Sequence, residues 1–252
     1  MSPMAISWVA FACVFAGLLL GITLRRTLPK HHLSDEAKDA VKLGMGLIAT
    51  MSALVLALLI ASAKSSHDMQ SSEVTEMASD FIQLDRTLAR YGPDTKDIRN
   101  LIPATISNMI DRTWSEDAYR SENLDSALGA AADIFYGKFQ QLEPRTDFQR
   151  ALYAQTLQIS MELGRIRSRL LEETGGSIPM PFLVVLIFWL TLIFTSFGLF
   201  APTNSTVIVI LLACALSVSG AIFLILELDR PFQGLLQISS APLRNALIHI
   251  GR

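Results

Sequence analysis

The stretch 182–200 of this 252-residue chain reads FLVVLIFWLTLIFTSFGLF and indicates a membrane protein. It carries no charged side chain, and at about 1.5 Å per residue it is long enough to cross a hydrocarbon core of about 30 Å. Pro179 and Pro181 stand directly before it, and proline is well tolerated in the first turn of a helix. The stretch therefore predicts a membrane-spanning helix that begins at these prolines.

Three further apolar runs have a similar length and also lack charge. They cover 6–24, 43–63 and 207–226. A cleaved signal peptide is the alternative for the first run, but no charged segment precedes it and the run is too long for such a signal. The last two runs are separated only by 201–206, which predicts an antiparallel hairpin. The chain is expected to be a multi-pass protein of the cell (inner) membrane with four spans.

A polar segment, 64–178, separates the second span from the third. Apolar residues recur in it at steps of three and four, the spacing of amphipathic helices. Four such series cover 74–88, 98–109, 124–142 and 148–170. The alternation typical of strands does not occur. These patterns predict an all-α, polytopic membrane protein with four transmembrane helices and an extramembrane four-helix bundle inserted between the second and third.

The predicted organisation has four parts. Residues 1–63 hold the first two spans and a basic loop, 64–178 the bundle, 179–228 the hairpin of spans three and four, and 229–252 a membrane-proximal tail. The tail is apolar on one face but too short to cross the membrane again. We expect it to fold back against the bundle or a neighbouring subunit, with Ser240 capping a short helix. The alternative is a loose C-terminal end. Lysine and arginine flank both sides of the membrane, so the orientation of the bundle stays open.

Composition and motifs exclude several functional classes. The net charge is -2 and 17% of the residues are charged, so a nucleic-acid partner is not expected. The spans contain no ionisable side chain, which disfavours a proton-coupled carrier. Nucleotide-binding and hydrolase motifs are missing, and His31 and His32 lack partners at a metal-ligand spacing. The protein is predicted not to be an enzyme and to need neither a metal nor a cofactor.

Small residues recur at fixed steps on two spans. Gly17 and Gly21 form a GxxxG step on the first span, which either packs closely against another helix or arises by chance. On the second span, a stripe of small residues suits either close packing or the lining of a narrow pore: Thr50, Ala53, Ala57 and Ala61. Hydroxyls on the third span either contact a permeating ion or bond to their own helix.

Polar residues also gather at the ends of the spans that adjoin the bundle. They are His67 and Asp68 after the second span, and Glu227 and Asp229 at the end of the fourth. One interpretation is that they are solvated at the membrane surface. The alternative is that an oligomer arranges them around a pore mouth or vestibule, where His67 would respond to pH.

Two motifs resemble a known family. SIPMPF at 177–182, with Pro179 and Pro181, and ELDRPFQG at 227–234, with Pro231, Phe232 and Gly234, resemble the opening of the third span and the exit of the fourth in bestrophins. The continuation LLQISSAPL at 235–243 is more similar to the bacterial bestrophin-like family of unknown function. Bestrophins are pentameric anion channels in which the second span lines a narrow apolar neck. The resemblance implies that the small residues of the second span line such a neck here.

Two functional hypotheses therefore stand at the level of sequence. The first is a homo-oligomeric ion channel, permeable to small inorganic anions, with the second span lining the pore. The alternative is a non-conducting membrane scaffold or sensor whose helical bundle binds a ligand or a partner. A small-molecule transporter is less favoured, because the chain lacks an internal repeat and broken midplane helices. The predicted partners are the lipid bilayer and further copies of the same chain.

Overall fold

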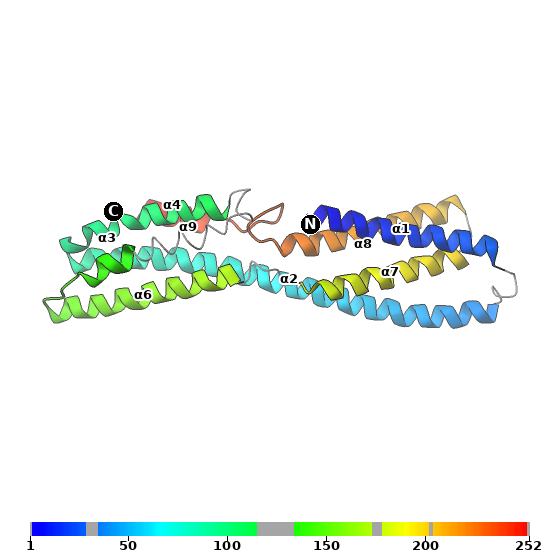
Figure 1. Ribbon diagram of the computed structural model, residues 1–252, viewed down its shortest axis with the longest axis horizontal. Coiled ribbons are helices and arrows are strands. Elements are labelled where there is room, and N and C mark those ends of the chain that lie inside the picture. The colour runs from blue at the N-terminus through cyan, green and yellow to red at the C-terminus, as the bar shows by residue number, and fades with distance from the viewer. Residues whose placement is uncertain (1, 29–34, 115–133, 173–177, 202–203, 251–252) are drawn as a thin grey trace. The chain divides into compact units, whose positions relative to one another are not determined.

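The computed structural model describes residues 2–28, 35–114, 134–172, 178–201 and 204–250. Within these ranges every regular element is a helix, and strands do not occur (Figure 1). The predicted all-α class is confirmed for this part of the chain. The chain divides into two compact units: residues 1–66 with 176–229 form the first, and residues 67–175 with 230–252 form the second.

In the described part of the chain, four helices are long and apolar enough to cross a membrane, and they cover the four predicted spans. They are α1 (Pro3–Thr27), α2 (Asp35–Tyr91), α7 (Met180–Phe200) and α8 (Ser205–Leu228). The start of α1 is capped by Ser2, whose hydroxyl oxygen accepts from the backbone N–H of Ala5 at 3.2 Å. Its last turn carries Arg25 and Arg26, which suit the negative end of the helix dipole.

The first unit is organised around α1. This helix packs closely against both α7 and α8 (Figure 1). The core of the unit contains fully buried side chains from all three helices, among them Val14, Leu186 and Ile222. The helices of the predicted hairpin, α7 and α8, are consecutive in the chain. In the core of the unit, each of them packs against α1.

The second helix, α2, continues without interruption from the apolar run at 43–63 into the amphipathic series at 74–88, so it contributes to both units. The sequence between 64 and 91 contains neither glycine nor proline, so nothing in it breaks the helix. The helix ends at Tyr91, and Gly92 follows with φ of 133°, a conformation that side chains other than glycine rarely adopt.

The second unit is a helical bundle. Beyond α2 it contains the short η2 (Pro93–Thr95) and α3 (Lys96–Arg99), then α4 (Leu101–Thr113), helical residues 134–140, α6 (Asp147–Glu172) and α9 (Ala241–His249). Arg99 joins α3 to α2 through two hydrogen bonds to the buried carboxylate of Asp85, at 2.7 and 3.1 Å. Of the third predicted series, residues 124–133 lie outside the described residues, as do the glycines at 175–176 and the histidines at 31–32.

The C-terminal tail belongs to the core of this bundle. Ile238, Leu243, Ala246 and Ile250 are buried there with the apolar faces of α2, α4 and α6. The indole N–H of Trp114 donates to the carbonyl oxygen of Ile238 at 2.7 Å. The prediction that the tail folds back against the bundle is confirmed. Ser240 occupies the N-cap position of α9, but its side chain does not cap the helix. The backbone N–H of Ala241 donates instead to the hydroxyl of Ser239 at 3.2 Å.

Candidate functional site

The predicted lining of the second span lies on an open face of α2. Four side chains form this stripe, and all are exposed in the single chain: Thr50, Ala53, Ala57 and Ala61. The hydroxyl of Thr50 donates to the carbonyl oxygen of Gly46, at 2.9 Å on the same helix. The stripe is therefore smooth and nearly free of polar groups that point outward.

Another face of the same helix packs inside the first unit. Leu59 and Ala63 are buried in its core, and Ser52 is buried as well. Ala57 and Ala61 are each two positions from Leu59, about 200° around the helix axis. In the most apolar 18 residues of α2 only 11% are buried, against 33% in α1 and α7 and 22% in α8. This span is thus the one that leaves most of its surface uncovered in a single chain.

The glycines of the first span serve a different purpose, which is close contact between helices. A Cβ atom placed on Gly21 would lie 2.1 Å from the carbonyl oxygen of Thr195, and one on Gly17 would lie 2.8 Å from that of Thr191. Gly198 on α7 makes the same kind of close contact with α1, because a Cβ atom on Gly198 would lie 2.2 Å from the carbonyl oxygen of Leu18. The GxxxG step is therefore a true helix contact.

The hydroxyls of the third span are engaged within their own helix. Thr191 donates to the carbonyl oxygen of Ile187 at 2.8 Å, and Thr195 donates to that of Thr191 at 2.7 Å. Both side chains also lie against the position of Gly17. Their surroundings are those of a packing contact between α1 and α7.

The polar residues at the span ends fall in both units. In the second unit, His67 has its Nε2 atom 3.0 Å from the carbonyl oxygen of Leu236 and its Nδ1 atom 3.7 Å from the carboxylate of Asp68. This histidine therefore contacts the C-terminal tail. In the first unit, Glu227 is buried near the end of α8, and Asp229 is half-buried as the residue after the helix.

The residues of the two sequence motifs have local structural roles. Pro179 precedes α7 as its N-cap and Pro181 occupies the first turn. Pro231 is buried, and the ring of Phe232 meets that of Trp114 edge to face, with the ring centres 5.2 Å apart. Gly234 has φ of 85°, which favours glycine. The motifs thus mark a helix start and the turn that leads the tail into the bundle.

A group of carboxylates lies on the bundle surface between α2 and α6. Burial, followed by the charges of Glu76 and Glu162, raises the pKa of Asp80 above its usual value of 3.8. Among the described residues, the Oδ2 atom of Asp80 is buried without a hydrogen-bond partner. Glu162 pairs with Arg165 on its own helix.

Two residues that the sequence motifs do not include lie in the bundle at a tail contact and at a cavity. Trp114 holds the tail through its indole N–H. Arg167 lines a cavity inside the bundle, and its position was signalled by spacing. It stands four residues after Leu163 and three before Leu170, so it shares the apolar face of α6.

Comparison with known proteins gives two matches. The family described as Bestrophin-like domain matches residues 12–243 of this chain. The fold is similar to the crystal structure of a bacterial bestrophin homologue from Klebsiella pneumoniae that carries a point mutation. That likeness has a TM-score of 0.58 at 14% sequence identity, and it covers 95% of this chain and 98% of the other. No curated protein matches the sequence.

Proposed function

Because this chain belongs to the bestrophin-like family, we propose that it is a homo-oligomeric ion channel that conducts small inorganic anions. In this proposal α1, α2, α7 and α8 cross the cell (inner) membrane, and the bundle is inserted outside the bilayer between the second and third crossings. The likeness to a bacterial bestrophin homologue along nearly the whole chain supports the arrangement of helices.

The main observation in support of the proposal is that the stripe of small residues on α2 is exposed in the single chain. In a single chain, α1 packs against α7 and α8, whereas α2 has the smallest buried share of the four and its residues Thr50, Ala53, Ala57 and Ala61 are exposed. Several copies arranged around an axis would turn this stripe toward a shared path. A narrow path lined by small side chains selects ions through partial dehydration and the field of helix dipoles, so it needs no charged residue at its centre.

The polar span ends and the oligomer complete the proposal. His67, Asp68, Glu227 and Asp229 would lie at the membrane surface on the bundle side and form the entrance to the path. The partners would be lipids, further copies of the chain and small anions. Because the chemistry is permeation, the proposal requires no catalytic residue, metal or cofactor.

The test is anion flux through the purified protein in liposomes. Replacing Ala57 by Phe narrows the path and replacing it by Asp adds a negative charge, so we expect Ala57→Phe to reduce chloride flux at least severalfold and Ala57→Asp to lower the preference for anions over cations. Ala16→Phe on α1 is the matched control, because Ala16 is also an exposed alanine of a span but lies outside the stripe.

Mass measurement of the detergent-solubilised protein accompanies this test. A closed ring of four or more subunits is expected. A monomer or dimer without flux would favour the scaffold or sensor function instead. If both Ala57 variants form the oligomer in equal yield and conduct like the unchanged protein, the path must be lined by another helix.

A further inference from the structure

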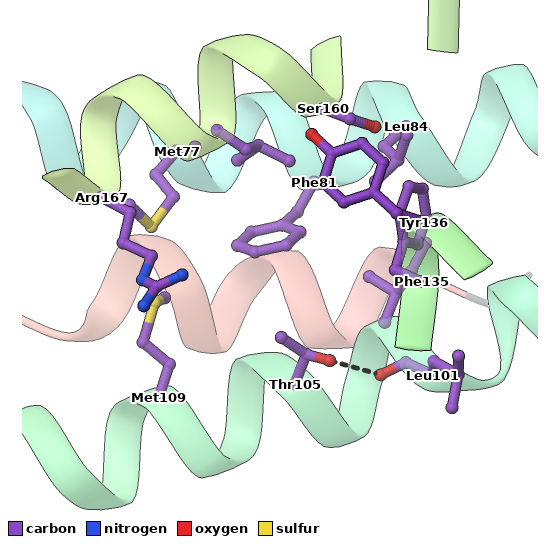
Figure 2. A pocket seen from close by; sticks show the side chains of 13 residues that line it. Met77, Phe81, Leu84, Leu101, Thr105, Met109, Phe135, Tyr136, Ser160 and Arg167 are labelled. Atoms are coloured by element: carbon purple, nitrogen blue, oxygen red, sulfur yellow. Dashed lines mark hydrogen bonds between the residues drawn. The ribbon is translucent and has the colours of Figure 1, made fainter. Parts of the chain in front are cut away.

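The bundle contains a cavity of about 120 Å³. It lies between α2, α4, α6 and the helical residues 134–140 (Figure 2). Most of its wall is apolar and comes from Met77, Phe81, Leu84, Met109 and Phe135. An engineered apolar cavity of about 150 Å³ is known to hold benzene. The present cavity is smaller but partly open to the surface, so it suits a body of about one ring or a short chain that is not fully enclosed.

The polar side chains that line the cavity differ in their capacity to donate hydrogen bonds. The hydroxyl of Thr105 donates to the carbonyl oxygen of Leu101 at 2.9 Å, and the hydroxyl of Ser160 donates to that of Thr156 at 2.8 Å. Both protons are thus used within the helices. Arg167 is the one charged side chain among the described residues that line the cavity. Its guanidinium carries several N–H donors, more than any other of these side chains.

Arg167 lies at one end of this space. Figure 2 shows its guanidinium beside Met77 and Met109, while Ser160 and Tyr136 lie toward the other end. A permanent cation next to an apolar wall attracts a molecule with a charge at one end only. The planar fork of arginine matches a carboxylate with two parallel hydrogen bonds.

We propose that this cavity binds a small amphipathic carboxylate, a molecule with one carboxylate that pairs with Arg167 and an apolar body about as large as a single ring. The apolar body would fill the space between Phe81 and Phe135, and burial of that body would supply most of the affinity. The proposal concerns the bundle alone, so it stands or falls independently of ion conduction.

The test is equilibrium dialysis of labelled benzoate against the full-length protein in detergent, with protein-free micelles as the blank. We expect saturable binding of one benzoate per chain, with a dissociation constant on the order of 1 mM for a ligand of this size. Benzylamine, which has the opposite charge, should not bind saturably. Benzyl alcohol, which has no charge, should bind at least about tenfold more weakly. Equal binding of all three would overturn the assignment of an anion.

Variants locate the site. Arg167→Gln should weaken benzoate binding by about tenfold or more. Arg165→Gln is the matched control, because Arg165 lies on the same helix but outside the cavity and should bind benzoate like the unchanged protein. Equal affinities of these two variants would overturn the role of Arg167.

A second pair of variants fills the space. Ser160→Leu should abolish binding while the thermal midpoint is kept, because leucine occupies part of an existing void. If Ser160→Leu does not fold, Gly164→Leu serves the same purpose, since a Cβ atom on Gly164 has no neighbour within 4 Å and this residue also lines the cavity. Unchanged benzoate binding by a folded filling variant would show that the ligand lies elsewhere.

Discussion

Gly21 sets the separation of α1 and α7, because backbone of α7 occupies the place where its side chain would stand. Gly21→Ala must push the helices apart, and we expect a loss of about 2 kcal/mol in the free energy of unfolding. The measurement is the thermal midpoint in detergent by circular dichroism. Gly220→Ala on α8 is the control, since a Cβ atom there meets no atom within 4 Å. Equal midpoints for both variants would mean that the close contact does not limit stability.

Asp80 makes the stability of the bundle depend on pH. Because burial and neighbouring carboxylates raise its pKa in the folded protein, the folded state holds the proton more tightly than the unfolded state does. Asp80 therefore contributes to the stability of the folded state at a pH below 3.8, the usual pKa of its carboxyl. This contribution is lost as the pH rises through the higher pKa of the folded protein. Repulsion from Glu76, four residues earlier on the helix, costs about 0.5 kcal/mol at neutral pH.

Asp80→Asn should accordingly raise the thermal midpoint at pH 7, by an amount that corresponds to about 0.5 kcal/mol. The difference between variant and unchanged protein should shrink as pH falls through the raised pKa of Asp80, because the carboxyl then becomes protonated. The comparison is Glu143→Gln, which changes an exposed carboxylate to an amide. A gain in midpoint that stays constant between pH 4 and pH 7 would contradict the assignment to this carboxyl.

Among the structural elements, the C-terminal tail with α9 is a buried part of the bundle core. Leu243 on α9 is 1% exposed, whereas Leu235 in the preceding turn is 76% exposed. Leu243→Ala should therefore cost about 3 kcal/mol, and Leu235→Ala should cost little. Truncation after Gly234 removes both, together with the carbonyl oxygen that accepts from Trp114.

The tail is tested with Trp8 and Trp189 replaced by Phe, so that Trp114 is the remaining tryptophan. Truncation should move its fluorescence to longer wavelength, because the indole loses its packing against the tail and meets water. Leu243→Ala should lower the thermal midpoint, and Leu235→Ala should keep it. A truncated protein with unchanged fluorescence, stability and assembly would show that the tail does not stabilise the bundle.

If the whole chain crosses the membrane four times, the side of the membrane on which each connecting segment lies can be predicted. The first crossing leads from the N-terminus to the basic loop, and the second returns. Asn100 in the bundle should therefore face the same side as Ser2, and Asn204 between α7 and α8 should face the opposite side. Cys13 and Cys214 are free and exposed in the single chain, so both are first replaced by Ser.

Single cysteines at these three positions are then labelled in sealed vesicles with a reagent that does not cross the membrane. Asn100→Cys and Ser2→Cys should react from one side, and Asn204→Cys from the other. The same labelling also identifies the side of the bundle, which the distribution of lysine and arginine leaves open. Labelling of Asn100→Cys and Asn204→Cys from one side would remove the four-span arrangement.

Features that depend on residues close together in the chain could be predicted without a structure. Uncharged runs such as 182–200 and the steps of three and four in 74–88 are local patterns, and each settles a helix because a helix is built from local hydrogen bonds. The contacts between helices could not be predicted in this way and became visible in the folded chain. It packed α1 against both α7 and α8, and the backbones of α1 and α7 approach closely where Gly21 and Gly198 face each other. It also brought Arg167 to a cavity shared with α2 and α4. Such contacts join residues far apart in the chain, and their geometry depends on packing that local patterns do not encode.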